Sequence, residues 1–200
     1  MRRPKARGNK ATQLNQQVSY RWHFPERTLH VVDIENLAGA AIPTVIQVNE
    51  VQDWYLTRLG FGAADQAVLA SSHLGFINAA LGWPHARYKV RSGRHGADLE
   101  LLDVLEHEDV AARFSHVVIG SGDGMFGRAA GRLRDRGVRV TVVSRPGSLA
   151  VALARVAQDV VYLDIPRHAA LRGPARAGEP VGRLGGGHGP FSTAEFEFLS

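Results

Sequence analysis

Apolar residues follow two alternating patterns between residues 29 and 165. Short runs rich in Val, Ile and Leu predict β-strands, and longer segments with apolar positions three or four residues apart predict α-helices. The predicted strands are residues 29–34, 66–71, 86–91, 116–121, 138–144 and 160–163. The predicted helices are residues 44–59, a short segment ending at 82, 98–114 in one or two pieces, 125–136 and 148–157.

Strands that alternate with helices predict parallel βαβ units. The stretches Val117-Val-Ile119 and Val140-Thr-Val-Val143 are apolar on both faces, which is typical of strands buried in a parallel sheet. The expected fold class is therefore α/β, a three-layer α/β/α sandwich around a mainly parallel, Rossmannoid sheet.

The flanks of this region differ from it in composition. Residues 1–27 are polar and basic, and we expect a largely disordered arm there. Residues 166–200 are rich in Gly, Pro and Arg, which predicts a flexible tail. The sequence thus predicts one domain over residues 28–165 between two flexible segments.

The net charge of +5 is concentrated near the start of the chain. Residues 1–28 hold seven Lys or Arg residues against Glu26 alone, whereas residues 29–164 hold 13 basic and 15 acidic residues. A basic arm on a near-neutral body can hold a polyanion by counterion release. It can equally be a solubilising tail, and the sequence leaves both interpretations open.

The chain has no cysteine, which excludes disulfides, thiolate metal sites and a cysteine nucleophile and fits a reducing cytoplasm. No apolar run approaches the roughly 18 residues of a membrane span. Arg2-Arg3 is not followed by an apolar segment, so we expect no export. These features predict a cytoplasmic protein with no membrane partner.

Three aspartates occupy positions where parallel α/β sheets bind ligands, which is beyond the carboxyl ends of the strands. Asp33 ends the first predicted strand, Asp98 opens the helix after the third, and Asp123 follows the fourth. Clustered carboxylates repel one another unless a cation shares them. Oxygen ligands favour Mg²⁺ or Mn²⁺ over zinc. The sequence therefore predicts that Asp33, Asp98 and Asp123 converge on a divalent ion.

Each of these residues also has a purely structural interpretation. Asp98 could be an N-cap and Asp123 an ordinary turn residue. Asp33 is harder to explain in this way, because an unpaired carboxylate at the buried end of a central strand is costly. Glu35 fits a solvated position, and Asp103 fits the helix surface.

Three ordered motifs resemble those of a NYN domain, a branch of the PIN-like nucleases. The motifs are Asp33-Ile-Glu-Asn36, Gly96-Ala-Asp98-Leu-Glu-Leu-Leu-Asp103 and Ser121-Gly-Asp123-Gly-Met-Phe126. The resemblance covers about residues 29–164, and the last predicted helix and strand fit that family's closing unit. It implies a PIN-like sheet and a ribonuclease that depends on Mg²⁺ or Mn²⁺. Residue by residue, it implies metal ligands at Asp33, Asp98 and Asp123 and supporting roles for Asn36 and Ser121.

One position departs from the family pattern. The family commonly has a second aspartate in Ser-Gly-Asp-x-Asp-Phe, where this chain has Met125. Losing that carboxylate weakens the expected metal site without affecting the fold. A non-catalytic domain that binds RNA or a protein partner is therefore the main alternative function.

Two further interpretations are weaker. Gly122-Asp-Gly124-Met-Phe-Gly127 imitates an NADP-binding GxGxxG fingerprint, with Arg145 ending the next strand. Against it, the motif carries an aspartate aimed at the phosphate site. A haloacid-dehalogenase-like phosphatase is less compatible still, because Asp33-Ile-Glu35 lacks the second aspartate and the threonine of that family's opening motif.

Basic residues near the three predicted aspartates indicate a polyanionic partner. Arg87, Lys89 and Arg91 alternate along the third strand and so share one face, with Arg94 just beyond. If that strand lies at an edge, this face could bind a single-stranded RNA backbone, or its charges could protect the edge from aggregation. The partner is expected to be RNA, and a homodimer is left open.

Overall fold

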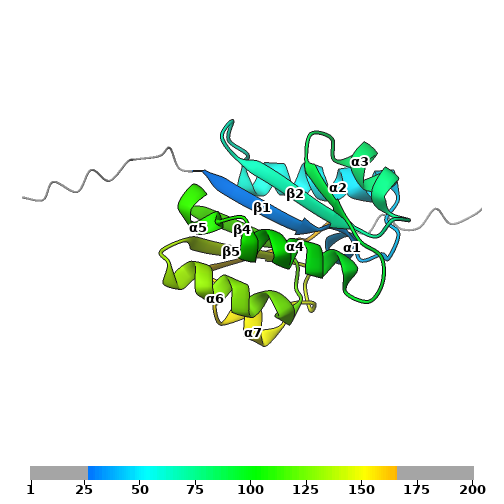
Figure 1. Ribbon diagram of the computed structural model, residues 1–200. Coiled ribbons are helices and arrows are strands. Elements are labelled where there is room, and N and C mark those ends of the chain that lie inside the picture. Colours follow the sequence, from blue (N-terminus) through cyan, green and yellow to red (C-terminus); the bar gives the residue numbers. More distant parts are fainter. Residues whose placement is uncertain (1–26, 166–200) are drawn as a thin grey trace, which may run out of the picture. The chain divides into compact units, whose positions relative to one another are not determined.

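The computed structural model describes residues 27–165. The predicted tail and the predicted arm, apart from Arg27, lie outside the described residues. Six parallel strands form one sheet in the order β3-β2-β1-β4-β5-β6 (Figure 1). The strands are β1 (Thr28–Asp33), β2 (Gln66–Ser71), β3 (Arg87–Val90), β4 (His116–Gly120), β5 (Arg139–Ser144) and β6 (Asp159–Tyr162).

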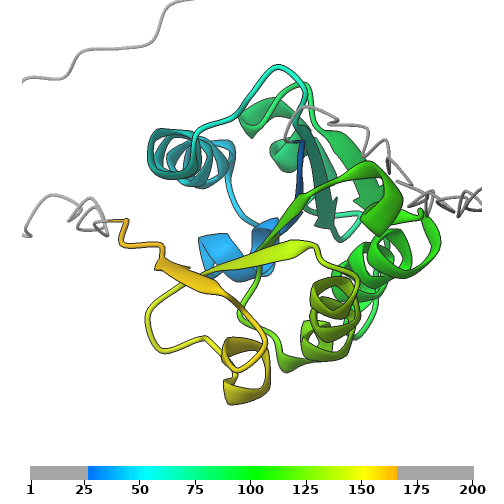
Figure 2. The ribbon, with the colours of Figure 1, turned by 90° about the vertical axis from the view of Figure 1, so that its left-hand side faces the viewer.

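Helices cover both faces of this sheet, so the expected three-layer α/β/α sandwich is confirmed (Figures 1 and 2). One face carries α1 (Ile34–Ala38), α2 (Val45–Leu59) and α3 (Phe76–Gly82). The other face carries α4 (Gly96–His107), α5 (Val110–Arg113), the 3₁₀ turn η1 (Gly124–Phe126), α6 (Gly127–Asp135) and α7 (Val151–Ala154).

The direction of chain progression reverses between β1 and β4. The chain builds β2 and β3 on one side of β1, then returns to place β4 on the other side. The two strands pair in parallel as far as Val32 opposite Gly120, so Asp33 and Ser121 are the next residues along each chain. This edge is the switch point at which doubly wound sheets bind ligands.

Alternate residues of the central strands enter two separate cores. Leu29 and Val31 pack on the side of α4 to α7, whereas Val32 packs on the side of α1 to α3. Val118 and Ile119 of β4 divide in the same way. Burial of both faces explains why these strands read as continuous apolar runs.

Helix α2 shows how closely local sequence signals set an element's bounds. Thr44 Oγ1 accepts the Gln47 N–H at 3.2 Å, and Gln47 Oε1 accepts the Thr44 N–H at 2.9 Å, which forms a capping box. Apolar residues three or four apart along this helix, Val48, Val51 and Tyr55, are buried on one face.

Three elements differ from the prediction. The segment predicted as helix 148–157 contains only α7, because the Ala150 N–H donates to the Gly122 carbonyl at 2.8 Å and holds the preceding residues in a loop. The segment predicted as helix 125–136 begins with η1 before α6. Helix α1 was not predicted; its five residues directly follow β1.

Among residues 27–165, no helix combines the length and the apolar composition needed to cross a membrane.

Candidate metal centre

The three predicted aspartates lie together at the carboxyl edge of the sheet. Asp33 ends β1 and caps α1, Asp98 lies in the first turn of α4, and Asp123 caps η1 after β4. The carboxyl groups of Asp33 and Asp98 lie within hydrogen-bonding reach of each other, and Asp123 is close enough to Asp98 to raise its pKa. Three segments far apart in sequence thus bring three carboxylates to one place.

Asp33 is almost completely buried, at 6% exposure. Burial is the main cause that raises the pKa of its carboxyl to about 7, and the neighbouring Asp98 and Glu35 raise it further. The Asn36 N–H opposes this by donating to Asp33 Oδ1 at 3.0 Å. The pocket therefore disfavours a bare negative charge at Asp33.

Asp98 is in a similar position, at 7% exposure. Burial raises the pKa of its carboxyl, and Asp123 adds to this effect, whereas contacts with Asp33 and His95 oppose it. Its Oδ1 atom is buried and has no hydrogen-bond partner among the described residues. A buried acceptor without a donor is costly unless a ligand satisfies it.

The supporting residues hold the backbone around Asp123. Asn36 Oδ1 accepts the Gly122 N–H at 3.1 Å and so joins α1 to the loop after β4. Ser121 is fully buried, and its Oγ accepts the Asp123 N–H at 3.2 Å. Asp123 Oδ1 in turn accepts the Met125 N–H at 2.8 Å, which leaves Oδ2 facing the cluster. Both predicted supporting residues therefore lie beside the aspartates.

His95 belongs to the same cluster, although none of the three sequence motifs includes it. Its Nδ1 lies 3.4 Å from Asp98 Oδ2 and 3.9 Å from Asp123 Oδ2. One donor atom from each of these three residues lies within 4.8 Å of the other two. In the sequence, the only sign of this role was the position of His95, three residues before a candidate aspartate.

Two sequence interpretations of acidic residues were wrong. Glu35 is not simply solvated, because its Oε1 accepts the Ser72 N–H at 2.6 Å and the Ser71 hydroxyl at 3.1 Å and so joins α1 to the end of β2. Asp98 is not an N-cap, because His95 holds that position in α4. Asp103 does lie on the surface, with its side chain 54% exposed.

The glycines of the NADP-like fingerprint have a different role in this structure. A Cβ on Gly122 would lie 2.2 Å from the Ser148 carbonyl oxygen, so only glycine allows this contact between the two loops. In this chain the motif follows β4. In dinucleotide-binding Rossmann folds the fingerprint follows the first strand. Gly122 is therefore explained by packing against the protein's own backbone.

The predicted RNA-binding face lies on an edge strand, but its charges are largely paired. Arg87 makes two hydrogen bonds with Glu108, at 2.8 and 2.9 Å. Lys89 and Arg91 each lie within 3.8 Å of Glu100. Arg94 Nε donates to His95 Nε2 at 3.3 Å and so lies next to the cluster. RNA binding by these four residues stays a prediction.

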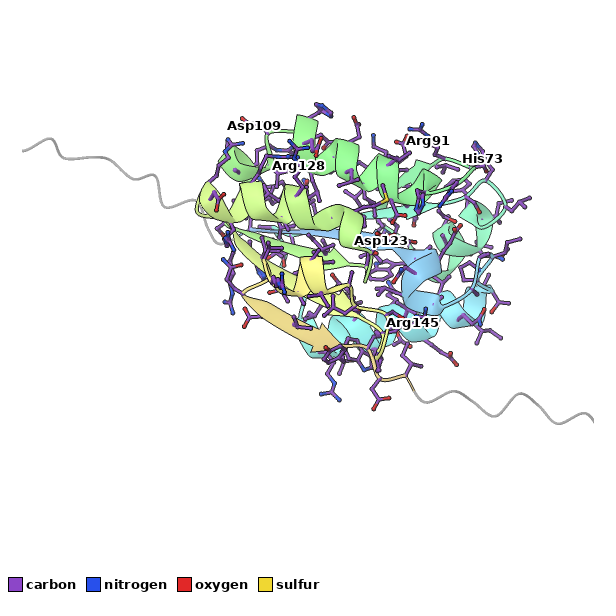
Figure 3. The ribbon with its side chains drawn as sticks, turned by 90° about the horizontal axis from the view of Figure 1, so that it is seen from below. His73, Arg91, Asp109, Asp123, Arg128 and Arg145 are labelled. Atoms are coloured by element: carbon purple, nitrogen blue, oxygen red, sulfur yellow. The ribbon has the colours of Figure 1, made fainter. Side chains whose placement is uncertain are left out.

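Arg145 is a further cation at this edge. It follows β5, and its Nε donates to the Asn36 carbonyl at 2.8 Å. Among residues 27–165 it makes no ion pair with a carboxylate. In Figure 3, Asp123 and Arg145 lie near α1, whereas Asp109 lies at the other end of the domain.

The donor set fits a divalent cation. Two nearly buried carboxyl groups have raised pKa values, one of their oxygens has no donor, and a third carboxylate lies beside them. A cation placed among them would satisfy the free acceptor and offset the repulsion.

The raised pKa of Asp33 predicts a pH-dependent stability in metal-free protein. Its contribution is fully present below about pH 4 and is lost as the pH rises through about 7, because the folded state disfavours the charged form. Asp33→Asn should therefore be more stable than wild type at pH 8 by on the order of 2 kcal/mol, or roughly 5 °C in melting temperature.

Thermal melts in EDTA at pH 8 and pH 5 check this expectation. The difference between Asp33→Asn and wild type should shrink at pH 5, where wild-type Asp33 is mostly protonated. Equal melting temperatures at pH 8 would show that the pocket does not penalise this charge.

A cavity of about 300 Å³ lies at the opposite, amino ends of the strands. Its lining includes Thr28, His116 and Arg139, which begin β1, β4 and β5. It is separate from the carboxylate cluster.

Comparisons with known proteins identified a family by sequence. A sequence model of the NYN domain matches residues 62–164, a span that includes Asp98 and Asp123 and begins after Asp33. A solved structure of a protein of unknown function from Vibrio parahaemolyticus is 19% identical, with a TM-score of 0.47, over 70% of this chain and 93% of that one. No curated protein matched the chain.

Proposed function

The chain belongs to the NYN domain family, and we propose that it is a metal-dependent ribonuclease that hydrolyses RNA phosphodiester bonds. The observation that carries the proposal is the convergence of Asp33, Asp98 and Asp123 with a buried, unpartnered Asp98 oxygen. Carboxylate oxygens are the ligands that Mg²⁺ and Mn²⁺ prefer in proteins.

In this proposal, Asp33, Asp98 and Asp123 hold the ion. Asn36 and Ser121 keep the loop after β4 in position through their hydrogen bonds to Gly122 and Asp123. A bound divalent ion would lower the pKa of a water molecule and offset the charge that develops on the phosphate. Hydrolysis by such a water molecule requires no nucleophilic side chain.

The main alternative is a domain that binds RNA or a protein without cleaving it. Met125 favours this alternative, because it stands where the family pattern has a carboxylate. A cleavage assay separates the two: labelled single-stranded RNA is incubated with purified protein and Mn²⁺ or Mg²⁺, with EDTA as control. Shortened products only in the presence of the ion support the nuclease, and intact RNA that is nevertheless bound supports the binding domain.

The partners and location follow from the same proposal. Single-stranded RNA is the expected substrate, because an extended strand can bring one phosphate to the carboxylates while its neighbours contact basic side chains. The cysteine-free composition is compatible with a cytoplasmic protein.

Arg145 is expected to contribute more to RNA binding than the paired arginines. Arg145→Ala should weaken binding of single-stranded RNA roughly threefold to tenfold and lower the log–log salt slope by about 0.7, which corresponds to one lost phosphate contact. Arg87→Ala is the matched control, since its guanidinium is already paired with Glu108.

Fluorescence anisotropy over a series of salt concentrations measures both quantities. If Arg87→Ala lowers the affinity and Arg145→Ala does not, the RNA follows β3 and not the side of α1.

A further inference from the structure

His95 points a ring nitrogen at the same space as two of the aspartates. Its Nδ1 lies 3.4 Å from Asp98 Oδ2 and 3.9 Å from Asp123 Oδ2. Neighbouring ligand atoms of an octahedral ion with bonds of about 2.1 Å lie about 3.0 Å apart, and opposite ones about 4.2 Å. The three donor atoms, all within 4.8 Å of one another, need only small movements to reach one ion.

Hydrogen bonding alone accounts poorly for this arrangement. A charge-assisted hydrogen bond between an imidazole and a carboxylate is expected at about 2.7–2.9 Å, shorter than either His95 distance. Asp98 Oδ1 has no partner among the described residues although it is buried. A single proton on His95 Nδ1 cannot satisfy both carboxylates, whereas a cation can.

The backbone at the start of α4 holds His95 in this position. His95 adopts the left-handed conformation, with φ 58° and ψ 24°, and its side chain makes no capping bond to the helix. The next residue, Gly96, packs so tightly that a Cβ there would lie 2.2 Å from the Arg91 carbonyl oxygen. The loop before α4 therefore turns the imidazole toward the cluster instead of toward the helix end.

We propose that His95 is a direct nitrogen ligand of the divalent ion, beside Asp98 and Asp123, and that it makes the site prefer Mn²⁺ over Mg²⁺. This inference rests on the proposed function. Imidazole is a suitable ligand for first-row transition ions, whereas Mg²⁺ binds almost entirely to oxygen. The nitrogen donor also supplies a ligand in a site where Met125 replaces an acidic residue.

Ligation through Nδ1 requires the ring proton to sit on Nε2. Arg94 Nε now donates to His95 Nε2 at 3.3 Å, so ion binding would break this contact. The His95 side chain is 40% exposed and the contact lies at the surface, so both side chains have room to move.

Pulsed electron paramagnetic resonance of the Mn²⁺-loaded full chain tests the ligation directly, because a coordinated imidazole modulates the manganese spin echo at ¹⁴N frequencies. Wild type should show this modulation, and His95→Gln should lose it. His73→Gln is the matched control and should retain it, because His73 is an exposed histidine bonded to Ser92. Competition titrations should show the Mn²⁺-over-Mg²⁺ preference falling about tenfold in His95→Gln only.

Two different results would show that His95 is not a ligand and that the metal centre itself is wrong. If Mn²⁺ binds wild type and is lost in Asp98→Asn/Asp123→Asn, but no ¹⁴N modulation is seen, the carboxylate site stands and His95 is not a ligand. If the double variant binds Mn²⁺ as wild type does, the metal centre itself is wrong and both proposals fall.

Discussion

Asp98→Asn should reduce metal-dependent RNA cleavage by a factor of roughly 100 to 1,000. Asp98 interacts with every other member of the cluster. Its carboxyl group lies near those of Asp33 and Asp123 and near the His95 ring. Asparagine keeps the size of the side chain but removes the charge, and loss of one ligand at a catalytic ion costs several kcal/mol of barrier lowering.

Asp103→Asn is the matched control for this variant. Asp103 lies on the same helix, but its side chain is 54% exposed and lies near Lys89 and His107. Cleavage by Asp103→Asn should stay within about twofold of wild type. Rates are compared at saturating Mn²⁺, with thermal melts to confirm that both variants are folded. Equal cleavage by wild type and Asp98→Asn would remove the carboxylate cluster from the mechanism.

Met125→Asp should raise metal-dependent cleavage by about tenfold or more. Met125 is only partly buried and belongs to neither apolar core, so a polar side chain there costs little packing. Its backbone N–H already donates to Asp123 Oδ1, which places the new carboxylate close to the site. The added charge increases the repulsion within the cluster, so the gain should appear only with the ion present.

Met125→Asn is the control that separates charge from polarity. It should cleave at the wild-type rate, and Met125→Asp should also bind Mn²⁺ more tightly. If neither Met125→Asp nor wild type cleaves faster than Asp98→Asn, the domain is a binding module.

The three aspartates could be predicted because their positions follow from topology. Each ends a strand or begins the helix after one, and parallel strands bring such positions to a single edge. His95 could not be found in the same way, because its direction depends on the left-handed backbone before α4 and on the close approach of Gly96 to Arg91. Such a loop conformation leaves no periodic pattern in the sequence.

Ion pairs between residues far apart in the chain were the second feature that could not be predicted from the sequence. Arg87 and Lys89 read as a free basic face, but their partners Glu108 and Glu100 lie on or just after α4. The short α7 has a similar origin, because residues 148–150 contact Gly122 instead of continuing a helix. In both cases, contacts between distant segments override a correct local pattern.

The origin of the oxygen atom added to the product distinguishes metal-assisted hydrolysis from attack by the RNA itself. RNA is cleaved with Mn²⁺ in H₂¹⁸O, and the products are weighed by mass spectrometry. Hydrolysis by a water activated at the carboxylate cluster predicts one ¹⁸O in the terminal phosphate of a product and no 2′,3′-cyclic phosphate. Accumulation of the cyclic phosphate without ¹⁸O would show attack by the RNA's own 2′-hydroxyl and would contradict the account.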